Sequence, residues 1–149
     1  MKIYLASDHA GFSHKEAIAH MLVVAGHEII DCGAVSYDAA DDYPAFMHKA
    51  ALAVSKDSAS RAVLFGGSGQ GEAIVANRRT GVRAVVYYGG SLDIIKLSRE
   101  HNDANVLSLG ARFLSIDDAK AAVSLWLGTP FSADERHVRR IGDIDSKHI

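Results

Sequence analysis

One short segment constrains this chain more than any other: an apolar run at residues 62–65 stops at a loop with four glycines. Residues 66–72 read Gly-Gly-Ser-Gly-Gln-Gly-Glu. The run is too short for a helix and is typical of a buried parallel strand. Residues 72–79 suit a helix, so the glycines are predicted to lie between a strand end and a helix start. There, backbone N–H groups and the positive helix end can hold an anion.

Strands and helices are predicted to alternate along the whole chain. The expected strands are residues 2–7, 27–31, 61–65, 82–87 and 104–109. The expected helices are residues 13–25, 43–58, 72–79, 91–100, 116–127 and 132–146. Five strands separated by helices imply a parallel sheet with helices on both faces. The 149 residues fit one domain, and no segment has the composition of a linker.

Composition narrows the classes of partner. The net charge of −2 argues against general nucleic-acid binding, which usually needs a basic face. No apolar run approaches the roughly 20 residues that span a membrane, and the N-terminus lacks a signal-peptide layout. The single cysteine, Cys32, excludes an internal disulfide and fits a reducing compartment. We therefore expect a cytoplasmic protein that binds neither nucleic acid nor membranes.

Polar residues follow the strands at their carboxyl ends, where parallel α/β sheets bind ligands. These ends carry Ser7-Asp8-His9, the glycine loop, residues 87–90 and residues 110–112. An acid and a histidine directly after a strand are expected in a site rather than in a core. The sequence thus predicts one site at this edge of the sheet.

The loop does not fit the familiar nucleotide signatures. A dinucleotide fingerprint needs its third glycine one residue later, and a P-loop needs Lys-Ser/Thr where Glu72-Ala73 stand. A nucleophile elbow fails because Gln70 replaces its last glycine. A tight turn that only packs strand against helix remains an alternative, although it would explain one or two glycines rather than four.

Glu72 suggests proton-transfer chemistry. Proton abstraction beside a carbonyl needs a base and N–H donors for the enediolate oxygen, and the loop offers both. The helix end favours the ionised carboxylate whereas burial opposes it, and the sequence leaves that balance open. Glu72 could instead be an acidic first-turn residue that complements the helix dipole. His101 could be an acid or base, because histidine titrates near neutrality, or it could be structural.

The arginines near the C-terminus predict a phosphate clamp. Arg136 and Arg140 are four residues apart and share a helix face, and two guanidinium forks on one face suit a phosphate. Asp134 and Glu135 could instead form surface ion pairs with them. The eight histidines are dispersed without a His-x-x-x-His pair, so no metal site is predicted.

Seven runs in order make the chain similar to a known family. They are Ser-Asp-His-Ala-Gly-Phe (7–12), the glycine loop (66–72), Ala-Asn-Arg (76–78), Gly-Val-Arg-Ala (81–84), Arg-Glu-His-Asn-Asp-Ala-Asn-Val-Leu (99–107), Gly-Ala-Arg (110–112) and Arg-His-x-x-Arg (136–140). The chain resembles the type B ribose-5-phosphate isomerases, with their galactose-6-phosphate and allose-6-phosphate isomerase relatives. The resemblance covers essentially the whole chain.

The resemblance implies a Rossmann-like three-layer α/β/α sandwich with a five-stranded parallel sheet. It implies aldose–ketose isomerisation of ribose 5-phosphate and ribulose 5-phosphate in the pentose phosphate pathway, through an enediolate and without metal or cofactor. It further implies a homodimer or a dimer of dimers with shared active sites, in which the C-terminal helix, about residues 132–146, reaches a partner subunit.

The resemblance also implies roles for individual residues. Those expected to act on the substrate are Asp8 and His9 as sugar-phosphate contacts, Gly67, Ser68, Gly69, Gln70 and Gly71 as the anion hole, Glu72 as base, His101 as ring-opening proton donor, Asn102 as a substrate ligand, and Arg112, Arg136 and Arg140 as phosphate ligands. The last two are expected to come from the partner. Asp8 would help to open the ring, and Ser68 would take part in catalysis.

One position departs from the common pattern of the family. Many members use a cysteine base just after the third strand, where this chain has Gly66. Another branch uses a glutamate that closes the loop, and Glu72 matches it. The substrate could also be allose 6-phosphate, galactose 6-phosphate or a tetrose phosphate. A non-catalytic module that binds a phosphosugar or nucleotide, or an interaction protein with an arginine face, are the alternatives from other classes.

Overall fold

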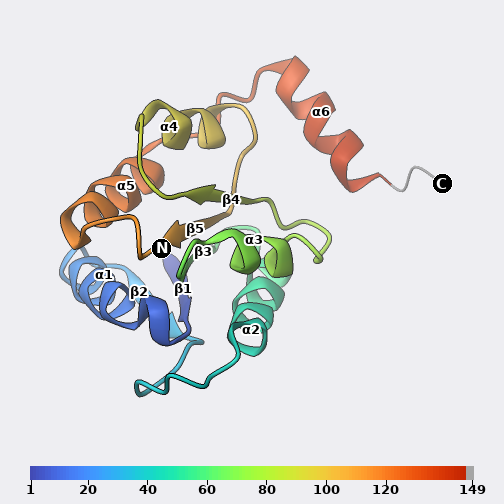
Figure 1. Cartoon of the computed structure of the whole chain (residues 1–149). Coiled ribbons are helices and arrows are strands. Elements are labelled where there is room, and N and C mark those ends of the chain that lie inside the picture. Colours follow the sequence, from blue (N-terminus) through green and yellow to red (C-terminus); the bar gives the residue numbers. More distant parts are fainter. Residues whose placement is uncertain (147–149) are drawn as a thin grey trace.

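A computed structural model, which describes residues 1–146, shows a five-stranded sheet with helices on both faces (Figure 1). The strands are β1 (Lys2–Ser7), β2 (Glu28–Asp31), β3 (Arg61–Gly66), β4 (Ala84–Tyr87) and β5 (Val106–Gly110). Their order is β2-β1-β3-β5-β4, and every neighbouring pair is parallel. The predicted Rossmann-like α/β/α fold is confirmed.

The helices form two layers, and one helix belongs to neither. The helices are α1 (Phe12–Val24), α2 (Tyr43–Lys56), α3 (Gln70–Ala76), α4 (Asp93–Glu100), α5 (Ile116–Gly128) and α6 (Glu135–Asp145), with a short 3-10 helix η1 (His9–Gly11) after β1. Helices α1, α4 and α5 share one core cluster with the sheet, and α2 and α3 share the other. Helix α6 projects beyond both layers (Figure 1).

The central strands are buried on both faces, which explains their continuous apolar sequence. In β3, Val63 and Phe65 belong to the same core cluster as Trp126, whereas Ala62 and Leu64 belong to that of Met47. Burial of both faces holds the strand rigidly, and its last residue delivers the chain into the glycine loop. None of the helices within residues 1–146 is long and apolar enough to cross a bilayer.

Several boundaries differ from the prediction, and turns explain three of them. Helix α3 begins at Gln70 rather than residue 72, after Gly69 with φ 78° as its N-cap, so Glu72 lies in the first turn. Strand β4 begins at Ala84 rather than residue 82, after a turn with Gly81 at φ 79°. Helix α6 begins at Glu135 rather than residue 132, because Ala133 has φ 58°, which no helix accommodates.

The topology places two loops side by side. The chain continues from β1 to β2 on one side of β1, while β3 lies on its other side. Strands β1 and β3 therefore flank a topological switch point, the usual ligand crevice of such sheets. Asp8 and His9 follow β1 and the glycine loop follows β3.

Candidate active site

A cavity of about 430 Å³ lies at this edge of the sheet. Its walls come from the carboxyl ends of β1, β3 and β5 and from the first turns of α2 and α3. The lining residues are Asp8, His9, Ala10, Tyr43, Gly67, Ser68, Gly71, Glu72, Arg112 and Phe113. The predicted convergence of the strand ends on one site is confirmed for these elements.

The Glu72 carboxylate fills the space that a side chain at residue 66 would need. Glu72 is only 4% exposed yet lines the cavity. A Cβ atom on Gly66 would lie 1.9 Å from Glu72 Oε1 and 2.1 Å from its Cδ. Glycine at 66 and glutamate at 72 therefore belong together, because only glycine leaves room for this carboxylate at the end of β3.

Burial decides the balance that the sequence left open for Glu72. Burial raises the pKa of the Glu72 carboxyl, and the nearby Asp8 charge raises it further, while a hydrogen bond from its own backbone N–H lowers it. The net direction is upward. A carboxyl whose pKa moves toward neutrality can both accept and return a proton, as an isomerase base must.

Asp8 and His9 are held by two different carboxylates. Asp8 Oδ1 accepts the N–H groups of Ala10 and Gly11 at 3.0 and 3.3 Å, which caps η1. Asp41 Oδ1 lies 2.7 Å from His9 Nδ1 and accepts the His9 backbone N–H at 3.1 Å. This hydrogen bond raises the pKa of His9, although burial opposes it. The two contacts with Asp41 fix the His9 imidazole and favour its protonated form.

The same residues form a group that spacing in the sequence did not reveal. Asp8, His9 and Asp41 offer ligand atoms within 4.8 Å of one another, in the part of the chain that the structure describes. Asp41 Oδ1 already takes both N–H groups of His9 if Nδ1 is protonated. An imidazole–carboxylate pair accounts for this arrangement without a metal ion.

Arg112 lies over the glycine loop. Its guanidinium is so near that a Cβ atom on Gly67 would come within 3.2 Å of its Cζ. Its backbone N–H donates to the Gly67 carbonyl at 3.1 Å. Within residues 1–146 no carboxylate pairs with Arg112. Its guanidinium is exposed and forms a cationic wall of the cavity. This is the arrangement that a phosphate ligand requires.

Three residues of the glycine loop do not line the cavity: Gly66, whose place beside Glu72 is described above, Gly69 and Gln70. Gly69 is buried, and a Cβ atom there would lie 3.1 Å from the Gly110 backbone nitrogen. The exposed Gln70 donates its N–H to Ser68 Oγ at 3.3 Å. The cavity wall thus contains Gly67, Ser68 and Gly71, while Gly69 shapes the turn.

Four predicted site residues lie together elsewhere. His101, Asn102, Arg136 and Arg140 do not line this cavity. The His101 ring stacks on that of His137 in α6, with centroids 4.3 Å apart and 15° between the planes. Arg136 and Arg140 are exposed on α6, where Arg136 lies 3.9 Å from Asp134, a long surface pair. One chain therefore presents two separate groups of predicted site residues.

Comparisons with known proteins show the family to which this chain belongs. The family described as Ribose/Galactose Isomerase matches residues 3–144. The chain belongs to this family. Ribose-5-phosphate isomerase B of Mycolicibacterium paratuberculosis is 45% identical over 141 residues, which are 95% of this chain and 87% of that protein.

Two further relatives support the assignment to this family, and the first of them also confirms the fold. The crystal structure of ribose-5-phosphate isomerase B from Mycoplasma genitalium with bound ribulose-5-phosphate has a TM-score of 0.92 and 35% identity, covering 97% of this chain and 93% of that one. D-erythrulose-4-phosphate isomerase 2 of Mycolicibacterium smegmatis is 34% identical over 148 residues, covering 97% of this chain and 95% of that protein. The resemblance inferred from the seven sequence runs is confirmed.

Sequence reasoning did not predict Asp41, Tyr43 or Phe113 as part of the site. Asp41 holds His9, and Tyr43 and Phe113 line the cavity. Tyr43 lies against the loop so closely that a Cβ atom on Gly71 would come within 2.6 Å of its Oη. Proximity of Phe113 to Arg112 was the one available signal, because Asp41 and Tyr43 reach the site from a loop and helix whose position depends on tertiary packing.

Proposed function

We propose that this protein interconverts ribose 5-phosphate and ribulose 5-phosphate. The observation that carries the proposal is the buried Glu72 carboxylate beside Gly67, Ser68 and Gly71 in one cavity at the switch point. The 45% identity to a ribose-5-phosphate isomerase B and the likeness to a structure with bound ribulose-5-phosphate support the choice of sugar.

The geometry supports an enediolate route. Glu72 takes the proton from C2 of the open-chain aldose, and the negative charge moves onto the carbonyl oxygen at C1. Backbone N–H groups of the loop and the start of α3, which have no partners within the helix, stabilise that oxygen. Glu72 returns the proton to C1, and transfer of the hydroxyl proton from O2 to O1 completes the ketose. His9 and Arg112 lie where the phosphate end would bind.

A complete site requires a second subunit in this proposal. His101 and Asn102 lie with α6 rather than with the cavity, so we infer that all four distant residues act in the partner's site, not only Arg136 and Arg140. His101 would open the sugar ring there. The protein would work as a homodimer or a dimer of dimers, in the cytoplasm and in pentose phosphate metabolism.

A four-carbon sugar phosphate is the second candidate substrate. The relative named D-erythrulose-4-phosphate isomerase 2 shares 34% identity over 97% of this chain. Steady-state assays with aldose phosphates of four, five and six carbons distinguish the candidates. We expect the highest kcat/KM with ribose 5-phosphate, and a higher value with a tetrose or a hexose phosphate would reassign the substrate.

The variant Glu72→Gln tests the mechanism. We expect kcat to fall by about 10²–10⁴-fold, the usual contribution of a general base, while circular dichroism shows an intact fold. Glu28→Gln, an exposed glutamate on β2, is the matched control and should keep full activity. Turnover close to that of the unaltered protein in Glu72→Gln would favour a non-catalytic phosphosugar-binding module.

A further inference from the structure

Helix α6 carries the predicted phosphate clamp but has little packing to orient it. It lies apart from both helix layers (Figure 1). Only His137 among its residues is buried, while Val138 and Ile144 are exposed. A helix without a buried apolar face gains its orientation from a few specific contacts. In the described part of the chain, α6 contacts the rest of the domain at its two ends, through His137 and Asp145.

The N-terminal end of α6 is joined to the end of α4. His137 stacks on His101, the residue that follows α4. Just before α6, the Ser132 N–H donates to the Glu100 carbonyl at 3.1 Å. This end of α6 is therefore held beside His101, the predicted ring-opening residue.

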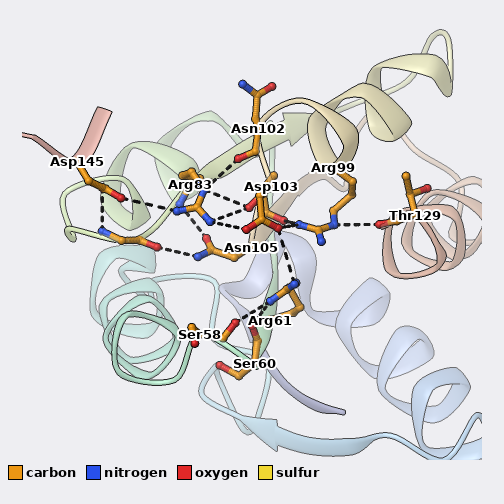
Figure 2. A network of polar contacts seen from close by, with 12 residues as sticks. Ser58, Ser60, Arg61, Arg83, Arg99, Asn102, Asp103, Asn105, Thr129 and Asp145 are labelled. Atoms are coloured by element: carbon orange, nitrogen blue, oxygen red, sulfur yellow. Dashed lines mark hydrogen bonds and ion pairs between the residues drawn. The ribbon is translucent and has the colours of Figure 1, made fainter. Parts of the chain in front are cut away.

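The C-terminal end of α6 contacts the turn before β4 through the side chain of Asp145. Its Oδ1 accepts the Gly81 N–H at 3.2 Å, and its Oδ2 lies 3.8 Å from Arg83 Nη1 (Figure 2). Gly81 has φ 79°, which turns this part of the chain ahead of β4. Within residues 1–146, the Asp145 carboxylate thus links the far end of α6 to the turn before β4.

Arg83 is itself held in a fixed orientation (Figure 2). Its Nε donates to the carbonyls of Asn102 and Asp103 at 3.0 and 3.1 Å, and its Nη2 donates to the Asp103 carboxylate at 3.0 Å. Asp103 has φ 44°, and its other carboxylate oxygen accepts from Arg99 Nη1 at 2.8 Å. With Nε and Nη2 occupied, Nη1 is the group that remains directed at Asp145.

We propose that Asp145 is a positioning residue that fixes the orientation of α6, so that Arg136 and Arg140 can hold a sugar phosphate in the partner's site. This rests on the proposed function for the clamp, and Asp145 itself does not touch substrate. Both ends of α6 are connected to the turn at residues 101–103. The N-terminal end contacts His101 directly, and the C-terminal end contacts Arg83, which is hydrogen-bonded to the turn. The turn and the clamp are thereby held as one unit.

The contact between Asp145 and Arg83 is weak, so its loss should change the orientation of α6 only in part of the molecules. The Asp145 side chain is 34% exposed and its ion pair with Arg83 is long, at 3.8 Å, so we expect the contact to change an equilibrium by no more than about fivefold. Loss of the contact would lower the fraction of molecules with α6 in the binding-competent orientation, and the apparent affinity for phosphate would fall by the same factor. Because His101 is held at the other end, the chemical step should be spared.

Steady-state kinetics of Asp145→Ala test the proposal against a matched control. Asp143→Ala removes the same charge from an exposed position of the same helix. We expect Asp145→Ala to raise KM for ribose 5-phosphate, and the inhibition constant of inorganic phosphate, by about two- to fivefold with kcat unchanged. Removal of a negative charge near a phosphate site should by itself lower KM. A rise in KM therefore cannot come from the change in charge alone. Equal KM values in the two variants would overturn the proposal.

Amide hydrogen exchange tests the positioning role of Asp145 independently of the proposed reaction, because the measurement needs no substrate. We expect faster exchange over residues 135–145 in Asp145→Ala than in Asp143→Ala or the unaltered protein. Unchanged exchange would refute the positioning role whatever the enzyme turns over. If the unaltered protein does not isomerise ribose 5-phosphate, the proposed function fails, and the exchange data still decide whether Asp145 orients α6.

Discussion

The Glu72 carboxylate occupies the space that any side chain at residue 66 would need. We therefore expect even the small substitution Gly66→Ala to displace it. The three atoms nearest to a Cβ added by Gly66→Ala all belong to the Glu72 carboxylate, the closest at 1.9 Å, so the carboxylate must move while the backbone can stay. We expect kcat to fall by about 10²-fold, the cost of misplacing a reacting group by about 1 Å. Urea unfolding should show a loss of no more than about 1–3 kcal/mol.

Gly128→Ala is the matched control, because a Cβ atom on Gly128 meets nothing within 4 Å. Its activity should equal that of the unaltered protein. If Gly66→Ala kept full activity, the carboxylate would have a second productive position, and the assignment of Glu72 as a base fixed at the end of β3 would be wrong.

The raised pKa of Glu72 also predicts how stability depends on pH. Because burial disfavours the ionised form in the folded state, the carboxyl contributes stability below its unfolded pKa of about 4.3 and loses it as pH rises through the folded value. Glu72→Gln should therefore be more stable than the unaltered protein at pH 7, by about 0.5–2 kcal/mol. The advantage should shrink toward pH 4.

Urea unfolding at pH 4, 5.5 and 7, at one protein concentration, measures this difference. Glu28→Gln, whose carboxyl is exposed on β2, should show no comparable trend. A Glu72→Gln protein that is less stable at pH 7 than at pH 4, relative to the unaltered protein, would mean that the ionised carboxylate is favoured by the fold and that its pKa is lowered.

At the scale of elements, local sequence predicted what local forces decide. Strands β3 and β5 are buried on both faces, so they were visible as short apolar runs, and the glycines marked the loop after β3. The beginning of α6 was misplaced because Ala133 adopts φ 58°, and an alanine gives no signal for a left-handed turn. Tertiary contacts, not residue propensity, keep that turn.

The parts of the site that the sequence left unseen depend on contacts between distant segments. The His9–Asp41 pair joins residues 32 positions apart, and the Arg83–Asp103 contacts join residues 20 apart. Asp103 and Asp145 look like ordinary surface acids in the sequence, and only the packing of β4 beside β5 brings Arg83 between them. Motifs locate catalytic groups, but they do not show what orients those groups.

At the scale of the whole molecule, the separation of the two groups of residues makes a strong prediction about subunits. One group lines the cavity with Glu72, and the other contains His101, which follows α4, and Arg136 and Arg140 on α6. If the second group serves the partner's cavity, one native site can be assembled from two defective subunits. Glu72→Gln supplies an intact clamp, and a subunit with both Arg136→Ala and Arg140→Ala supplies an intact base.

The two variants can be co-expressed with different affinity tags, so that purification on both tags selects mixed assemblies. A mixed dimer has one site with both defects and one site with none, and it should recover about half of the activity of the unaltered dimer. Each variant alone should remain strongly impaired. If instead each subunit used its own α6, both sites of the mixed dimer would stay defective, and activity no higher than the mean of the two parents would refute the shared site.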